Sequence, residues 1–328
     1  MSGAIAGTAI LHAPREPTSK LHTVTVAVNN RCNLQCPHCY LQYESPQSVL
    51  SEEHARMILD ADFKHLAIVG KEPTLNPEMV EFLVRENNQR GRKTSMITNG
   101  ILLSRISDET LKKLDYIDVS FDGGLRTYSK KRHYDYQSLI QILHETQQRG
   151  AHSVNALHTI YAENIEDIDD MMRIANDFPF NTIAFSPYQI PVNDGTVSVT
   201  PCSIPKQILP ALAAREPFMQ HDNATFLTSP HEMTSKEYAL FLRIVNELGL
   251  NRKVHCSPDP LTLGFIRVSH DGIVLAPSDS IHPAEYSQRG FSLDYYRSVD
   301  AQLNGSVLNY VFGLLLDYST TAHSPSLV

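Results

Sequence analysis

The chain has 328 residues, of which 42% are hydrophobic and 20% are charged, and its formal net charge at pH 7 is −8. This composition is typical of a globular protein with a large hydrophobic core. The negative charge argues against a nucleic-acid partner, which needs a basic face, and mildly favours a neutral or cationic small substrate. With no apolar run of membrane-spanning length and no recognisable secretion signal, we expect a cytoplasmic protein without a membrane partner.

From residue 22 to residue 186, short apolar runs that predict strands alternate with amphipathic runs that predict helices. The predicted strands are 22–28, 66–69, 94–98, 116–121, 153–160 and 182–186, and the predicted helices are 51–59, 77–88, 108–114, 136–148 and 165–176. Six strand–helix units of about thirty residues each indicate a parallel sheet with right-handed crossovers. In such sheets, ligands bind at the carboxyl ends of the strands.

The texture changes after Ser186, where prolines become frequent and the periodicity weakens. We expect a loop-rich segment with a short helix near 206–214, an amphipathic helix at 235–250, a β-hairpin at 264–268 and 273–275, and a helix near 307–316. The expected division is a lead-in at 1–21, a barrel at 22–190, a loop-rich insertion with a final helix at 191–253, and a C-terminal extension capping the substrate side at 254–328.

Three of the five cysteines, Cys32, Cys36 and Cys39, lie in one short loop directly after the first predicted strand. This bunching is not the pattern of a disulfide framework and indicates a metal site. Because a four-iron cluster normally takes four cysteines, three local ones leave one iron with an open position for chemistry. The alternative is a structural zinc site with His38 as the fourth ligand, although zinc sites usually pair two Cys-x2-Cys arms.

The Cys-x3-Cys-x2-Cys spacing resembles the signature of the radical S-adenosylmethionine (radical SAM) superfamily. Further segments after the following strands resemble motifs of the same family, over roughly residues 22–190. They are Gly70-Lys71-Glu72-Pro73, which is similar to Gly-Gly-Glu-Pro; Thr98-Asn99-Gly100; Ser120-Phe121-Asp122-Gly123; and Asn164 after the fifth strand. Lys71 replaces the second glycine of the family pattern, and His38 stands at its usual aromatic position.

The resemblance implies an α/β fold, a partial (β/α)6 TIM-like barrel with a C-terminal hairpin and helix extension. It also implies that Cys32, Cys36 and Cys39 hold one [4Fe–4S] cluster whose open iron binds S-adenosylmethionine. Reductive cleavage then gives a 5′-deoxyadenosyl radical that takes a hydrogen atom from substrate, with a flavodoxin- or ferredoxin-type protein as electron donor. The expected cofactor-binding residues are His38, Gly70, Lys71, Glu72, Asn99, Ser120, Asp122 and Asn164.

The chemistry of three of these residues, Glu72, Ser120 and Asp122, also supports their role. Glu72 carries a carboxylate able to pair with an α-ammonium group in a partly buried cleft. Ser120 and Asp122 are two residues apart at a predicted strand end, so we expect them to point to the same side and to bind a ribose diol.

The C-terminal hairpin is similar to the SPASM or twitch segment that carries a second cluster in many family members. Ser278 stands where the cluster cysteine of that segment is expected, and only Cys202 and Cys256 remain outside the first loop. Two cysteines are too few for a separate cluster, so we predict a single one.

Without a second cluster to accept an electron, a redox-neutral reaction is easier than a net oxidation. We therefore expect epimerisation of a sugar, an aminoglycoside or a nucleoside in natural-product biosynthesis, with Cys256 as the hydrogen-atom donor and His255 as a base or hydrogen-bond donor. A buried structural thiol is the alternative for Cys256. Radical decarboxylation or dehydrogenation, peptide modification, and a non-catalytic iron–sulfur sensor are the alternative functions.

Overall fold

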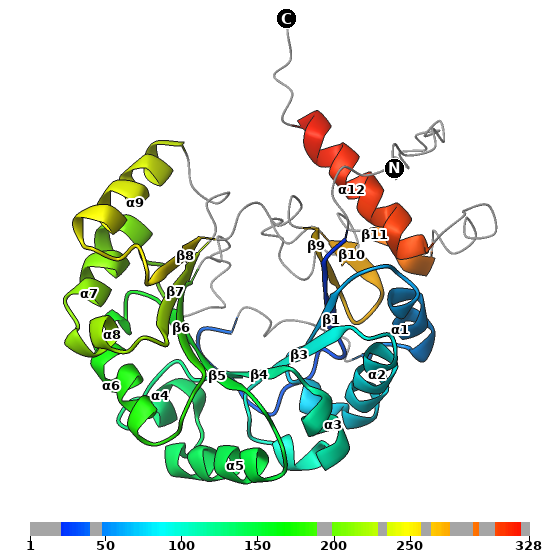
Figure 1. Cartoon of the computed structure of the whole chain (residues 1–328), viewed down its shortest axis with the longest axis horizontal. Helices are drawn as coiled ribbons and strands as arrows, with labels where there is room; N and C mark the ends of the chain where they lie inside the picture. Colours follow the sequence, from blue (N-terminus) through cyan, green and yellow to red (C-terminus); the bar gives the residue numbers. More distant parts are fainter. Residues whose placement is uncertain are drawn as a thin grey trace, which may run out of the picture.

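A computed structural model describes residues 21–39, 48–188, 199–228, 235–256, 264–275, 291–294 and 306–322. Strands and helices alternate around a curved sheet that forms an open barrel (Figure 1). Among the described residues, no helix is long and apolar enough to cross a membrane.

The sheet has eleven strands in the order β11-β10-β9-β1-β2-β3-β4-β5-β6-β7-β8. The pairings from β9 through β1 to β8 are all parallel, whereas β10 pairs antiparallel with β9 and with β11. The strands are β1 (Thr23–Ala27), β2 (His65–Val69), β3 (Lys93–Thr98), β4 (Tyr116–Ser120), β5 (Val154–Ile160), β6 (Thr182–Pro187), β7 (Ala224–Thr228), β8 (Val254–Cys256), β9 (Phe265–Val268), β10 (Ile273–Leu275) and β11 (Phe291–Ser292).

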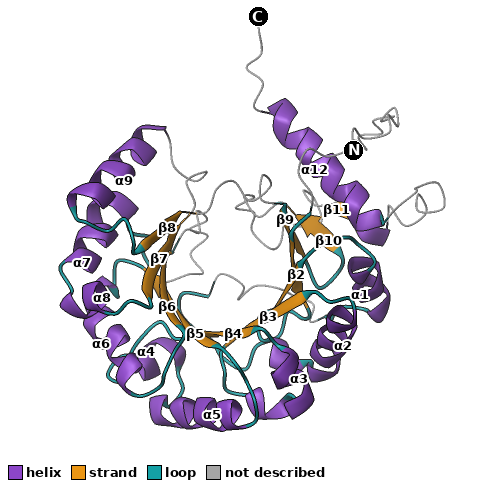
Figure 2. Ribbon diagram, in the orientation of Figure 1, coloured by secondary structure: helices purple, strands orange, loops and turns teal. Residues whose placement is uncertain are grey.

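Helices cover the outer, convex side of the sheet (Figure 2). The α-helices are α1 (Glu52–Leu59), α2 (Pro77–Gln89), α3 (Asp108–Lys113), α4 (Tyr128–Arg132), α5 (Tyr136–Gln148), α6 (Ile168–Met172), α7 (Leu209–Ala213), α8 (Glu216–Gln220), α9 (Ser235–Glu247) and α12 (Val307–Ala322). Short 3₁₀ segments lie at Pro73–Leu75, Leu103–Arg105, Ile165–Asp167 and Arg173–Asn176, and a π-helical turn at Ile204–Ile208 precedes α7. Side-chain caps start several helices, as where Ser51 accepts from the His54 backbone N–H at 3.0 Å.

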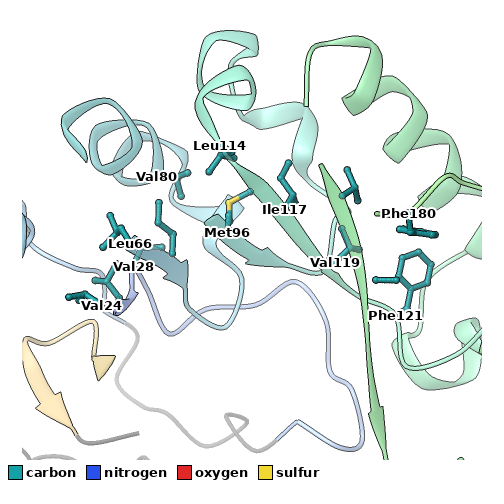
Figure 3. Close-up of a cluster of buried hydrophobic side chains, with 14 of the residues drawn as sticks. Val24, Val28, Leu66, Val80, Met96, Leu114, Ile117, Val119, Phe121 and Phe180 are labelled. Atoms are coloured by element: carbon teal, nitrogen blue, oxygen red, sulfur yellow. The ribbon is translucent and has the colours of Figure 1, made fainter. Parts of the chain in front are cut away.

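The two faces of the sheet differ in burial. In β4 and β5, every second residue is buried and the residues between them are partly exposed. The buried set packs on the helices in the main hydrophobic core, which contains Val24, Leu66, Met96, Val119 and Phe121 among others (Figure 3). The alternating residues lie on the opposite, concave side, which we call the inner face.

The structure confirms the partial α/β barrel and the β-hairpin, and it adds strands that the sequence did not predict. β7 and β8 extend the parallel sheet beyond β6, and β9 of the hairpin pairs with β1 in parallel. The segment expected to be loop-rich therefore contains a strand and additional helices. β8 is only three residues long, and β7 lies in a segment of weak periodicity, so their pairing partners identify them.

The hairpin turn docks on α1 through close packing. Gly272 has φ +80°, and a Cβ atom there would lie 2.6 Å from the His54 ring. The same ring binds Asp294 Oδ1 through Nε2 at 2.9 Å. A glycine is therefore required at this turn for both conformation and space.

Candidate active site

Five loops gather at the carboxyl edge of the sheet, and together we call them the rim. They follow β1 to β5 and comprise residues 29–39, 70–76, 99–101, 121–124 and 161–164. All the predicted cluster ligands and most of the predicted cofactor contacts lie on the rim. Parallel strands bring these distant segments together because their carboxyl ends meet at one edge.

The first loop carries the three cysteines. Cys36 is buried, and Cys32 and Cys39 are partly buried. Burial raises the pKa of the Cys32 thiol and raises that of Cys36 to about 11. Two of the sulfurs already have N–H donors: the Leu34 backbone N–H lies 3.3 Å from Cys32 Sγ, and Arg132 Nη1 lies 3.6 Å from Cys36 Sγ.

In the described part of the chain, no three His, Cys, Asp or Glu side chains surround a single metal-ion position. A four-iron cluster poses a different requirement, because each cysteine binds a separate iron. The donor set suits such a cluster: three thiols in one loop, with hydrogen-bond donors aimed at two sulfurs, as in protein sites that stabilise bound thiolates.

The predicted contact Glu72 is fully buried, and both its carboxylate oxygens are already bonded within the chain. Oε1 accepts from the Thr74 backbone N–H at 3.1 Å and from the hydroxyls of Thr74 and Thr98, each at 2.6 Å. Oε2 accepts from the Asn99 backbone N–H at 2.8 Å. Desolvation raises the pKa of Glu72, and these four bonds oppose that shift. Glu72 thus ties the loop after β2 to the loop after β3, and its direct contact with an α-ammonium group stays a prediction.

Asn99 connects this junction to the cysteine loop. Its Nδ2 donates to Asn33 Oδ1 at 2.8 Å and lies 3.9 Å from Cys32 Sγ, while its Oδ1 accepts from the Ile101 backbone N–H at 3.0 Å. The Asn99 side chain therefore contacts the loop that carries the first predicted cluster ligand.

The expectation that Ser120 and Asp122 share one side of a strand end is wrong. β4 ends at Ser120, and Asp122 has φ +56°, so the strand alternation does not extend to it. Asp122 is 1% exposed; its carboxylate pairs with Arg132 and with His38 Nε2 at 2.8 Å, and it accepts from the Thr159 backbone N–H at 2.6 Å. The Arg132 and His38 charges and these bonds outweigh desolvation and hold the pKa of Asp122 far below its usual range.

Asn164 and His38 are also buried by contacts within the protein. Asn164 Oδ1 accepts from the Tyr161 backbone N–H at 2.8 Å and Nδ2 donates to the Thr159 carbonyl at 2.8 Å, so its amide closes the turn after β5. The His38 ring stacks on Tyr161 with centroids 5.6 Å apart. Their side chains support the rim. Gly70 and Lys71 on the rim, and Ser120 at the end of β4, remain partly exposed.

Arg132, the last residue of α4, contacts the rim and was not predicted from the sequence. It follows Lys130 and Lys131, a run typical of a solvated turn, yet its side chain is only 12% exposed and bonds to both Asp122 and Cys36. These contacts depend on the folded structure, so the local sequence pattern carried no signal for them.

Among the C-terminal candidates, Cys202, His255 and Cys256 lie outside the five rim loops. Cys256 ends β8, and its side chain is outside the described residues, as is Ser278. His255 is exposed and pairs in register with Leu227 of β7, whereas Cys256 pairs with Thr228. Cys202 packs against the core, and burial raises its pKa to about 11.

Residues 26–175, which include the cysteine loop and all five rim loops, match the sequence profile of the Radical SAM superfamily. Residues 26–175 thus form a radical SAM domain. The cofactors of the radical SAM family are a [4Fe–4S] cluster and S-adenosylmethionine, which favours a cluster over the zinc alternative.

Curated relatives resemble the domain only in part. A 168-residue stretch, 48% of the chain, is 30% identical to the Fe-coproporphyrin III synthase of Methanosarcina barkeri and covers 42% of that protein. A 170-residue stretch, 48% of the chain, is 25% identical to the probable GTP 3′,8-cyclase of Methanocaldococcus jannaschii and covers 56% of it. The match thus spans about half the length of these relatives. It identifies a shared domain and does not show that the chain acts on their substrates.

Solved radical SAM structures share the fold at low sequence identity. The crystal structure of Streptococcus suis SuiB bound to precursor peptide SuiA superposes with a TM-score of 0.58 at 12% identity, covering 78% of this chain and 59% of that one. Native anSMEcpe with bound AdoMet and Cp18Cys peptide gives a TM-score of 0.54 at 15% identity, covering 90% of this chain and 80% of that one. The agreement extends over most of the chain and supports the partial-barrel architecture.

Proposed function

We propose that the chain is a radical SAM enzyme that binds one [4Fe–4S] cluster through Cys32, Cys36 and Cys39 and takes a hydrogen atom from a small polar substrate. The observation that carries this proposal is the cysteine loop, which places three thiols on the rim of a radical SAM domain with N–H donors already directed at two sulfurs. When bound and reduced, the cluster and S-adenosylmethionine together supply a carbon-centred radical able to abstract hydrogen.

The residues around the loop prepare the rim for an anionic cluster and a zwitterionic cofactor. Arg132 brings a buried positive charge beside Cys36, which offsets thiolate charge. Glu72 holds the Asn99 backbone, and Asn99 in turn contacts the loop of Cys32. Among the predicted cofactor contacts, the partly exposed Gly70, Lys71 and Ser120 are the most accessible, and we assign the direct contacts first to them.

The reaction that follows hydrogen abstraction is proposed to be redox-neutral, with epimerisation of a sugar or nucleoside first. Radical decarboxylation or dehydrogenation of such a substrate is the second option. The name GTP 3′,8-cyclase, borne by one of the curated relatives, supports a nucleoside-like substrate. Peptide modification and an electron-transfer or sensing role remain the alternatives from other classes.

Strand register bears on the proposed hydrogen-atom donor. Leu227 is 38% exposed whereas Thr228 is 6% exposed, so the inner face of β7 carries Leu227, and its partner His255 shares that face. The register therefore favours His255 over Cys256 for a contact with substrate. Product formation by His255→Ala and by Cys256→Ala tests which residue contacts substrate. If the reaction is an epimerisation, we expect product formed in D2O to gain one deuterium at carbon.

Metal content tests the cluster directly. We expect the anaerobically reconstituted protein to contain about four irons per chain, with loss of the cluster in Cys32→Ala, Cys36→Ala and Cys39→Ala. Cys202→Ala is the matched control, because Cys202 lies outside the loop, and it should retain the wild-type iron content. About eight irons, or an unchanged content in the loop variants, would contradict the single cluster.

Formation of 5′-deoxyadenosine distinguishes an enzyme from an electron-transfer or sensing protein. With S-adenosylmethionine and a strong reductant, the enzyme forms 5′-deoxyadenosine whereas a sensor does not. A flavodoxin- or ferredoxin-type protein is the proposed physiological electron donor and should replace the chemical reductant.

A further inference from the structure

The inner face of β4 carries three partly exposed polar side chains, Tyr116, Asp118 and Ser120. The residues between them, Ile117 and Val119, are 1% and 0% exposed and pack on the helix side. β4 lies between β3 and β5, so partial exposure of these side chains is possible only on the concave side of the sheet. The inner face is therefore accessible at this strand.

Asp118 differs from the buried carboxylates of Glu72 and Asp122 because it has a single hydrogen-bond partner. Its Oδ1 accepts from Asn155 Nδ2 at 2.8 Å. Among the described residues, no lysine, arginine or histidine pairs with it, and desolvation raises its pKa to about 6. Above that pH, a carboxylate charge lies in a partly dehydrated place without a counter-charge, which is costly unless a ligand supplies one.

The position of Asp118 matches the reach of a small molecule bound below the rim. Asp118 is two residues before Ser120, the last residue of β4, and in register with Asn155 of β5 and Ile97 of β3. Two residues of strand span about 7 Å. A molecule of sugar size whose reacting carbon lies at the rim can therefore place a polar group beside Asp118.

Deeper on the inner face, the polar groups are already satisfied. His65 Nε2 lies 2.9 Å from Ser95 Oγ and 3.2 Å from the Tyr116 hydroxyl, so the three side chains form a closed network. Burial lowers the pKa of His65, which favours the neutral imidazole. This network contributes no cation to Asp118 and forms a polar floor beneath it.

From these contacts we infer that Asp118, oriented by Asn155, binds a protonated amine of the substrate on the inner face. A carboxylate that has neither a counter-charge nor a second partner among the described residues recognises an ammonium group better than a neutral hydroxyl, because the charge-assisted bond is stronger. The inference rests on the proposed function in that the amine-bearing molecule is the substrate of the same barrel. It narrows the substrate class to small polar amines such as aminosugars.

Glucosamine and glucose are suitable probes because they differ only by an amine in place of a hydroxyl. Calorimetric titration uses the reconstituted holoenzyme with S-adenosylmethionine at pH 7, where both the Asp118 carboxylate and the amine are largely charged. We expect the wild type to bind glucosamine at least tenfold more tightly than glucose, and Asp118→Asn to lose about 10- to 100-fold in glucosamine affinity, the range for a charged hydrogen bond.

The matched control is Asp169→Asn, which removes an equal charge from the outer helix α6, where Asp169 is 42% exposed. It should bind both probes as the wild type does. Equal affinity of the wild type for the two sugars, unchanged glucosamine binding in Asp118→Asn, or no glucosamine binding at the solubility limit of the probe would each overturn the inference.

The same preparations are also assayed for 5′-deoxyadenosine, so that the two proposals can fail separately. A wild type that binds glucosamine through Asp118 and forms no 5′-deoxyadenosine contradicts the proposed function alone. A wild type that forms 5′-deoxyadenosine and ignores the amine contradicts the inference alone.

Discussion

The carboxylates of the rim and the carboxylate of the inner face differ in how many partners the protein gives them. Glu72 and Asp122 are 0% and 1% exposed, and every carboxylate oxygen has a partner within the protein. Asp118 is partly exposed and has one neutral partner. Burying a charge is tolerated where the protein satisfies it, so the rim is organised before any ligand arrives, whereas the inner face leaves one charge for a ligand to satisfy.

Among the substitutions considered, replacing Arg132 by Met should lower the free energy of unfolding the most. The change leaves the buried Asp122 carboxylate with only His38 and a backbone N–H, and removes the donor to Cys36. Loss of one partner of a buried ion pair costs about 3 to 5 kcal/mol. Chemical denaturation of the variant should show a loss in this range.

Arg126→Met is the matched control, because Arg126 also pairs with a carboxylate that is 1% exposed, Asp170, but is itself 64% exposed. Asp170 keeps the Arg126 and Thr127 backbone N–H groups and the Thr127 hydroxyl. The control should lose about 1 kcal/mol or less. Equal losses in the two variants would show that the Arg132 contact has no special weight.

Replacing Glu72 by Gln should cost about 2 kcal/mol, because an amide N–H then faces donors where an oxygen accepted. The four donors come from Thr74, Thr98 and Asn99, so the variant should also loosen the loop after β3. Hydrogen exchange of the Asn99 amide reports this loosening. Glu109→Gln, on a side chain 77% exposed, is the surface control, and an Asn99 amide as protected in Glu72→Gln as in wild type would contradict the account.

Replacing Asp118 by Asn should have the smallest effect on stability, with the opposite sign and a dependence on pH. The folded-state pKa of about 6 lies above the ordinary value of 3.8, so the folded state keeps its proton where the unfolded state has lost it. Stability therefore falls as pH rises from about 4 to about 6. The register partners of Asp118 are the uncharged Ile97 and Asn155, and among the described residues no charged group contributes to its pKa shift.

Asn keeps the acceptor for Asn155 and cannot ionise, so the variant should be more stable than wild type by about 1 kcal/mol at pH 8 and equal to it at pH 4. Because the side chain is partly exposed, this figure is well below the full value of the shift. Thermal melting across this pH range measures the difference. A variant that is less stable than wild type at pH 8 would mean that a cation within the protein already balances Asp118.

The alternation of strands and helices and the place of the motifs could be predicted from sequence, since both depend on local periodicity. The roles of several motif residues could not. Asp122 was placed by extending the strand alternation one residue beyond the predicted strand, whereas it has a positive φ and its carboxylate pairs with Arg132 and His38. The contacts of Arg132 with Asp122 and Cys36 were likewise not visible in the basic run that it shares with Lys130 and Lys131.

Asp118 lies between apolar residues in a strand, and its pattern alone indicates only an inner-face position. Its lack of a counter-charge is a property of the neighbouring strands β3 and β5, which the sequence of β4 does not contain. Sequence thus locates candidate residues by their place on strands, and the folded structure decides which of them are already satisfied.

The most direct measurement of the division between rim and inner face is 5′-deoxyadenosine formation by anaerobically reconstituted protein with S-adenosylmethionine and a strong reductant. Wild type, Cys36→Ala and Asp118→Asn are compared without substrate. The account predicts 5′-deoxyadenosine from wild type and Asp118→Asn at similar rates and none from Cys36→Ala. Formation by Cys36→Ala, or its absence in wild type or in Asp118→Asn, would contradict it.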